Sequence, residues 1–198
     1  MSELILASAS PRRRQMLSDL GIPFRVMVSE ADESCRERSA EAFALAVSAK
    51  KAKAVLEIAP EDSVVIACDT VVAYGDRILG KPADREEAKE MLRLLSGKEH
   101  RVISALCVAN KEKTVQKASV TYVSFREITD DELEAYVASG ECDDKAGAYG
   151  IQGLGGLFVS GIRGDWYTVV GMPLAELYGI LKNEFSLDFF ALKDGAAV

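Results

Sequence analysis

The stretch SVVIACDTVVAYGDRILGKP, residues 63–82, is a long apolar run that stops at Gly75-Asp76 and resumes briefly afterwards. Its β-branched residues predict a long strand, and the Gly-Asp pair predicts a tight turn into a short return strand. Shorter strand and helix patterns alternate on both sides of this hairpin, which favours an α/β fold. No repeat, low-complexity segment or linker interrupts them. We therefore expect one domain over residues 1–198, built as two closely joined lobes.

The other elements follow from cap residues and from the spacing of apolar positions. The sequence predicts a strand over residues 4–7, a helix from Pro11 to Gly21, a helix over residues 39–58, a helix capped by Asp84 and ending at Gly97, an antiparallel strand pair over residues 100–110 and 114–125, a helix with a Thr129/Glu132 capping box ending at Gly140, short strands near residues 157–160 and 166–170, and a last helix starting at Pro173.

Composition limits the class of partner. Lys and Arg number 24 and Asp and Glu number 31, so the net charge is 24 − 31 = −7, which argues against a nucleic-acid surface. No apolar run has the length of a membrane span, and no signal-peptide core precedes the first arginines. The cysteines are scattered at positions 35, 68, 107 and 142 without a CxxC pair, which indicates thiols in a reducing cytoplasm and makes a zinc site improbable.

Asp69 breaks the pattern of its own strand. It follows Val64-Val65-Ile66-Ala67-Cys68 and precedes further valines, in a strand that is apolar on both faces. An unpaired buried carboxylate costs several kcal/mol, so Asp69 must be paired, protonated, metal-bound or at a cleft. A structural ion pair is one interpretation. We prefer a catalytic or metal-binding carboxylate.

Three arginines occupy the first turn of the helix that Ser10 and Pro11 begin. Arg12, Arg13 and Arg14 lie where the helix dipole is already positive, so each costs roughly 0.3–1 kcal/mol there. A solvated basic turn is the simple explanation. The alternative is an anion site, because helix N–H groups, the hydroxyls of Ser8 and Ser10 and an arginine fork together suit a phosphate.

Two lysines add to this cationic set. Lys51 falls on the apolar stripe of its helix, among Val47, Ala54, Val55 and Ile58, and not with Lys50 and Lys53 on the solvent face. It is either a lysine that extends to water past an apolar rim or a point charge presented to phosphate. Lys81 leaves the return strand as Gly80-Lys81-Pro82. Exposed loop lysines are common, so this signal alone is weak.

Two polar residues stand in flexible-looking segments. Gln152 lies among glycines in DKAGAYGIQGLGG, a stretch that could be a loop without function but whose glutamine can both donate to and accept from a base edge. The stretch does not match a dinucleotide-binding fingerprint. Glu33, in the polar segment ADES, is either solvated or a hard-oxygen ligand for magnesium that carries phosphates.

Taken together, these segments resemble the Maf family of nucleoside triphosphate pyrophosphatases, roughly from Leu4 to Leu181. Several ungapped motifs in one order make the resemblance specific. They are LASASPRRRQML (residues 6–17), ADES (31–34), AKKAKA (49–54), ACDTVV (67–72), LGKP (79–82) and DKAGAYGIQG (144–153).

The resemblance implies a Maf-like (ITPase-like) α/β fold, with a central mixed twisted sheet flanked by helices and two lobes around a cleft, usually in a homodimer. It implies release of pyrophosphate from a nucleoside triphosphate with a divalent metal, Mg²⁺ first and Mn²⁺ or Co²⁺ as alternatives. Asp69 matches the family's catalytic aspartate. Arg12, Thr70 and Gln152 match the subgroup that acts on dTTP and UTP, whereas the 7-methyl-GTP subgroup carries tryptophan, glutamine and glutamate there.

We thus expect a cytoplasmic enzyme of nucleotide-pool housekeeping, without nucleic-acid or membrane partners. Asp69 is the catalytic base or a metal ligand with Glu33, and the substrate-binding residues are Ser8, Arg12, Arg13, Lys51, Thr70, Lys81 and Gln152. Two rivals stay open. A non-catalytic nucleotide-binding regulator of cell division would need neither Asp69 nor metal, and a nucleotidyltransferase would need a second substrate.

Overall fold

A computed structural model describes residues 2–193 of the chain, which divide into two compact units. Unit 1 contains the chain up to Asp69, residues 105–118 and the chain from Gly171 onward. Unit 2 contains Thr70–Ser104 and Ser119–Val170. Each unit is therefore assembled from segments that are far apart in the sequence.

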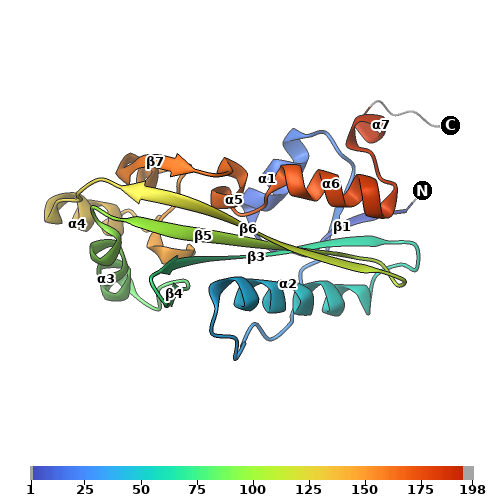
Figure 1. Ribbon diagram of the computed structural model, residues 1–198, viewed down its shortest axis with the longest axis horizontal. Helices are drawn as coiled ribbons and strands as arrows, with labels where there is room; N and C mark the ends of the chain where they lie inside the picture. The colour runs from blue at the N-terminus through green and yellow to red at the C-terminus, as the bar shows by residue number, and fades with distance from the viewer. Residues whose placement is uncertain (1, 194–198) are drawn as a thin grey trace. The chain divides into compact units, whose positions relative to one another are not determined.

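The strands form one mixed sheet in the order β2-β1-β3-β5-β6-β7, and β4 pairs with β3 (Figure 1). Strand β1 runs parallel to β2 and to β3, whereas β4 is antiparallel to β3 and β7 is antiparallel to β6. This confirms the predicted mixed sheet. The strand bounds are β1 Leu4–Leu6, β2 Arg25–Val26, β3 Val64–Tyr74, β4 Arg77–Leu79, β5 Glu99–Ala109, β6 Thr114–Phe125 and β7 Val159–Arg163.

Unit 1 also contains helices. They are α1 Pro11–Asp19, α2 Ala40–Leu56, α6 Leu174–Phe185 and α7 Phe189–Lys193, and Figure 1 shows α2 on one side of β3 and α6 on the other. The Ser39 side chain caps α2 by accepting a hydrogen bond from Ala42 N. The apolar face of α2 packs on the sheet in a buried cluster of Ile5, Ala7, Ala52, Val55, Val65, Ala67 and Cys107. Helix α2 thus covers the face of β3 that carries Val65 and Ala67, the two positions that precede Asp69 on that face.

Unit 2 is built from capped helices and turns. It holds α3 Arg85–Leu95, α4 Asp130–Ala138, the 3₁₀ turns η1 Ala146–Ala148 and η2 Leu154–Phe158, and α5 Trp166–Val170. Asp84 caps α3 and the Thr129/Glu132 box caps α4, as the sequence predicts. Helix α3 packs against α4 and against η1. The turn between β3 and β4 has Gly75 at φ 57°, a conformation that favours glycine.

Near the C-terminus one sequence prediction is wrong and another has shifted bounds. The segment 166–170, predicted as a strand, is helix α5, and the strand near 157–160 begins only at Val159 and continues to Arg163. WYTVV has strand-like propensity, but Asp165 Oδ2 accepts hydrogen bonds from Thr168 N at 2.7 Å and Thr168 Oγ1 at 2.9 Å, as a helix cap does. Local capping overrides propensity here.

The helix predicted over residues 39–58 ends at Leu56. Ile58 therefore lies outside it and is 68% exposed, so its predicted place on the apolar stripe is wrong. Among residues 2–193, no helix combines the length and apolarity that crossing a bilayer requires. All four cysteines are free thiols.

Candidate active site

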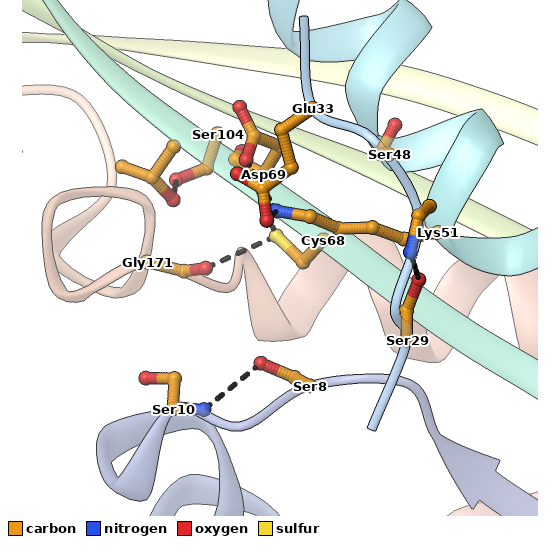
Figure 2. Close-up of polar contacts among 12 residues, drawn as sticks. Ser8, Ser10, Ser29, Glu33, Ser48, Lys51, Cys68, Asp69, Ser104 and Gly171 are labelled. Carbon is orange, nitrogen blue, oxygen red and sulfur yellow. Dashed lines mark hydrogen bonds and ion pairs between the residues drawn. The ribbon is translucent and has the colours of Figure 1, made fainter. Parts of the chain in front are cut away.

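Asp69 is 7% exposed and is paired with a lysine (Figure 2). Its Oδ1 accepts a hydrogen bond of 2.7 Å from Nζ of Lys51, a residue of α2. The Lys51 side chain is itself only 12% exposed. This contradicts the interpretation of Lys51 as a lysine that extends to water past an apolar rim. Both residues that departed from their apolar surroundings are therefore explained by one contact. The buried carboxylate has a counter-charge, and its neighbour Cys68 points to the other face of the strand.

Glu33 approaches the same ammonium group from the loop before α2. Its Oε1 lies 3.1 Å from Lys51 Nζ, and its side chain is 61% exposed. The adjacent Lys50 holds the backbone of this loop, because its Nζ donates to the carbonyl of Ser34 at 2.5 Å and of Asp32 at 3.4 Å. The two consecutive lysines of α2 therefore have different contacts. Lys50 holds the backbone of the acidic loop, and Lys51 lies between the carboxylates of Glu33 and Asp69.

The β1–α1 turn supplies the basic part of unit 1. Arg13 Nε donates to the carbonyl of Gly171 at 2.8 Å, and Arg13 Nη1 donates to Ser8 Oγ at 3.3 Å. Ser8 Oγ also accepts from Ser10 N at 3.2 Å. Since the Ser8 oxygen accepts both bonds, the hydroxyl proton is the group that it can offer to a phosphate. Part of the Arg13 guanidinium serves the fold, which the sequence does not reveal.

The Gly171 carbonyl connects this turn to β3, the strand that carries Asp69. It accepts from Arg13 and also from the buried thiol of Cys68, at 3.0 Å. Figure 2 shows the Gly171 carbonyl against the Cys68 thiol, and Cys68 directly precedes Asp69. One carbonyl oxygen therefore fixes both Arg13 and the strand position next to the carboxylate. Gly171 has φ 123°, which only glycine adopts readily. Unit 1 thereby brings Ser8, Arg13, Lys51 and Asp69 together with Glu33.

Helix α1 begins at Pro11 as predicted, but Ser10 does not cap it through its side chain. Ser10 has the extended backbone of a cap residue, and its N–H turns back to Ser8 instead. Arg12 and Arg13 are partly buried in the first turn, where no acidic residue compensates the helix dipole. This first turn therefore keeps the electrostatic preference for an anion that the sequence predicts.

Among residues 2–193, no cluster of three or more histidine, cysteine, aspartate or glutamate side chains forms a metal cage. Asp69 and Glu33 are two hard-oxygen donors on either side of one cation, Lys51. Mg²⁺ is typically bound by one or two carboxylates together with substrate phosphates, so this donor set fits such an ion better than a dedicated protein site. The oxygens that Lys51 does not engage, Asp69 Oδ2 and Glu33 Oε2, are the available ligands.

Within unit 2, neutral hydrogen bonds hold Thr70. Thr70 Oγ1 lies 2.8 Å from Ser104 Oγ, and Ser104 Oγ donates to the carbonyl of Thr168 at 2.8 Å. Ser104 is fully buried. The three residues come from β3, β5 and α5, so the orientation of the Thr70 hydroxyl depends on elements that are distant in sequence. Nothing in the spacing of Ser104 or Thr168 predicts this.

Lys81 and Gln152 are exposed residues of unit 2. Gly80 accepts a 3.0 Å hydrogen bond at its carbonyl from Gly147 N, which joins the segment of Lys81 to the start of the glycine-rich stretch. Gln152 lies in the turn before η2, with buried Ile151 on one side and Gly153 on the other. Hydrogen bonds hold this stretch at several backbone amides, which argues against the interpretation as a loop without structure.

Sequence reasoning missed Lys50, Gly171, Cys68 and Ser104. Each is an ordinary residue by composition, and each acts through a backbone carbonyl or a buried hydroxyl. Such contacts carry no periodicity or charge signal.

Comparison with known proteins adds a consistent result. The family model described as "Maf-like protein" matches residues 3–184. A Bacillus cytotoxicus protein named "dTTP/UTP pyrophosphatase" is 49% identical over 184 residues, which is 92% of this chain and 96% of that one. A Bacillus anthracis protein of the same name is 47% identical over 189 residues, 95% and 98% of the two chains. Among solved structures, the Staphylococcus aureus Ham1 protein aligns over 63% of this chain and 72% of its own, with 12% identity and a TM-score of 0.46.

Proposed function

This chain belongs to the Maf family, and from that premise we propose that it hydrolyses dTTP and UTP to the monophosphate and pyrophosphate. The observation that carries the proposal is the contact of Lys51 with two carboxylates, that of Glu33 and that of Asp69, which lies on an otherwise apolar strand. Unlike a surface ion pair, this one buries both charged groups, since the Lys51 and Asp69 side chains are 12% and 10% exposed, and it lies in the unit that also carries the basic start of α1. The same residues suit a phosphoanhydride substrate and a divalent ion.

The phosphate-binding residues are cationic or donate protons. Arg12, Arg13 and the start of α1 bind the triphosphate together with the Ser8 hydroxyl and the lysines Lys51 and Lys81. Because substrate brings about four negative charges, this local excess of positive charge is needed in a protein of net charge −7. These groups stabilise the charge that develops on the leaving pyrophosphate, which is the largest contribution expected in phosphoryl transfer.

Asp69 is the general base or orients the attacking water. Water adds to the α-phosphorus, the bond from that phosphorus to the bridging oxygen breaks, and pyrophosphate leaves with the bonding electron pair. The water proton passes to the Asp69 carboxylate and then to solvent. Lys51, at 2.7 Å, holds Oδ1 in place and leaves Oδ2 for one of the two roles, acceptor of the water proton or metal ligand.

A divalent metal is the cofactor that the family implies, with Mg²⁺ the first candidate and Mn²⁺ or Co²⁺ as alternatives. Asp69 and Glu33 would hold it, and it would supply charge neutralisation at the phosphate oxygens. We propose Thr70 and Gln152 as the residues that recognise the pyrimidine, with Arg12 as the third specificity position. The enzyme acts in the cytoplasm, as a homodimer of single-domain chains.

The decisive experiment measures pyrophosphate release from dTTP, UTP, CTP, GTP and 7-methyl-GTP in the presence of Mg²⁺. We expect release from dTTP and UTP well above the other three, and loss of release when EDTA removes the metal. Nucleotide binding without any pyrophosphate would contradict the proposal and favour the non-catalytic regulator. Product that forms only with a second substrate would favour the nucleotidyltransferase.

A further inference from the structure

Glu141 gathers three hydrogen-bond donors onto one carboxylate in unit 2. It follows Gly140, the residue after the C-cap of α4, and its Oε2 accepts from Leu154 N at 2.8 Å. Its Oε1 accepts from Gly155 N and from the Tyr136 hydroxyl, each at 3.1 Å. The two backbone donors are the first N–H groups of η2. A charged acceptor at such a position forms stronger hydrogen bonds than a neutral one.

Tyr136 extends the same network to the other end of the loop. Its hydroxyl accepts a 3.2 Å hydrogen bond from Gly150 N while it donates to Glu141. Burial of the ring raises the pKa of Tyr136 well above its usual range, so the hydroxyl keeps its proton at neutral pH. Backbone positions before and after Gln152 are therefore held by the same two side chains.

Two glycines allow the close approach that this network requires. A Cβ atom on Gly153 would lie 2.3 Å from Glu141 Oε2, and one on Gly155 would lie 2.9 Å from the Tyr136 oxygen. A side chain at Gly153 would displace the Glu141 carboxylate, and one at Gly155 would also meet the backbone of Gly150, at 2.8 Å from its carbonyl oxygen. The glycines around Gln152 are thus places where the loop backbone contacts Glu141 and Tyr136, and they need not indicate mobility.

We propose that Glu141 is a positioning residue for base recognition, which holds the turn that carries Gln152. In this segment Ile151 is buried and Gln152 is exposed, so the fixed backbone presents the glutamine side chain outward. The proposal rests on the proposed function only in assigning the pyrimidine to Gln152. Glu141 acts on affinity for the nucleoside part of the substrate and leaves affinity for the phosphates unchanged.

The substitution Glu141→Gln tests the carboxylate and preserves its size. A carboxylate accepts at both oxygens, whereas an amide must turn an NH₂ group toward at least one of the three donors. Glu134→Gln is the matched control, because Glu134 lies on α4, is more than half exposed and pairs with Lys89 at 2.8 Å. Tyr136→Phe is a second variant, which removes only the hydroxyl that links Glu141 to Gly150.

The measurement is calorimetric binding of two probes, with Mg²⁺, to the intact protein. One probe is the α,β-methylene analogue of dTTP, which resists cleavage, and the other is inorganic tripolyphosphate. We expect Glu141→Gln to weaken binding of the analogue about tenfold, Tyr136→Phe about threefold, and neither to change tripolyphosphate binding. The thermal midpoints should stay close to that of Glu134→Gln.

Unchanged analogue binding in both variants would overturn the proposal, and so would a parallel loss of tripolyphosphate, which would indicate general damage. If Glu141→Gln fails to fold, the Tyr136→Phe result decides alone. A wild-type protein that binds the analogue but releases no pyrophosphate from dTTP would refute the proposed function and leave the Glu141 inference intact. A wild-type protein that binds tripolyphosphate but not the analogue would overturn the inference.

Discussion

Unit 1 and unit 2 hold their candidate functional residues by different physical means. In unit 1 an ammonium group lies between two carboxylates, at 2.7 and 3.1 Å, next to a helix start with three arginines. In unit 2, Thr70 depends on the buried hydroxyl of Ser104, and the turn of Gln152 depends on backbone amides bound to Glu141. Lys81 is the exception, a cation of unit 2 that the proposed function assigns to the triphosphate. Charge in the first unit suits phosphates, and directional hydrogen bonds in the second suit a base edge.

The largest effect should come from the carboxylate of unit 1. Asp69→Asn keeps the size of the side chain and removes the base, so we expect kcat for dTTP to fall by about 10²–10⁴-fold with the fold retained. Asp62→Asn, at an exposed position before β3, is the control. Steady-state pyrophosphate release and circular dichroism measure the two properties. Near-normal turnover would remove Asp69 from the chemistry.

The contrast between the units also explains what the sequence could predict. Asp69 and Lys51 stand out because charges on apolar faces are costly, and the β3–β4 hairpin stands out through its strand pattern and its Gly75 turn. The strand bounds confirm the hairpin, and the ion pair shows that the buried Asp69 carboxylate has the partner its surroundings require, whereas its catalytic role stays a prediction. Helix α5 was missed because Asp165 caps a strand-like segment. The Ser104 and Gly171 contacts were missed because a single hydroxyl or carbonyl group leaves no pattern in one sequence.

Unit 2 contains the only histidine of the chain, and it should dominate the acid response of that unit. His100 is 2% exposed, its Nε2 lies 2.8 Å from the Tyr149 hydroxyl, and burial lowers its pKa to about 4. The folded state prefers the neutral ring. Stability is therefore complete above the unfolded pKa, near 6.5, and is lost as the pH falls from there to about 4.

The maximum loss is about 3 kcal/mol, from about 1.4 kcal/mol per pKa unit. Urea unfolding of wild type and His100→Gln at pH values from 4 to 7.5 measures it. Because the variant cannot titrate at this position, its free energy of unfolding should depend less on pH over that range, whatever its absolute stability. Parallel curves for the two proteins would show that His100 binds its proton equally well in the folded and the unfolded state.

Two matched lysines compare ion pairing in the two units. Lys51 contacts Asp69 and Glu33, whereas Lys89 contacts Glu134 and Glu86 at 2.8 and 3.2 Å on the surface of unit 2. Lys51→Met leaves the buried Asp69 carboxylate without a counter-charge, and we expect it to lower the free energy of unfolding by about 2 kcal/mol.

Lys89→Met should have a clearly smaller effect, because both of its carboxylates are solvated. Denaturant titration of the two variants provides the comparison. Adding Asp69→Asn to Lys51→Met should recover most of the loss, since the unpaired charge is then gone. Equal effects of the two lysine variants would mean that the Lys51 contact is no more desolvated than a surface pair.

The smallest effect should concern base choice in unit 2. Glutamine can both donate and accept, but a glutamate only accepts, so Gln152→Glu loses the donor that the carbonyl oxygens of thymine and uracil require. The amino group of cytosine can still donate to it. We expect the ratio of kcat/KM for UTP over CTP to fall about tenfold, which corresponds to about 1.4 kcal/mol of differential binding, with the Mg²⁺ dependence unchanged. Gln116→Glu, in unit 1, changes the net charge by the same amount and should leave the UTP-to-CTP ratio unchanged.

The opposite result would be a changed Mg²⁺ requirement with an unchanged UTP-to-CTP ratio. In that case Gln152 acts on the phosphates, and the division between an ionic unit 1 and a base-recognising unit 2 is wrong.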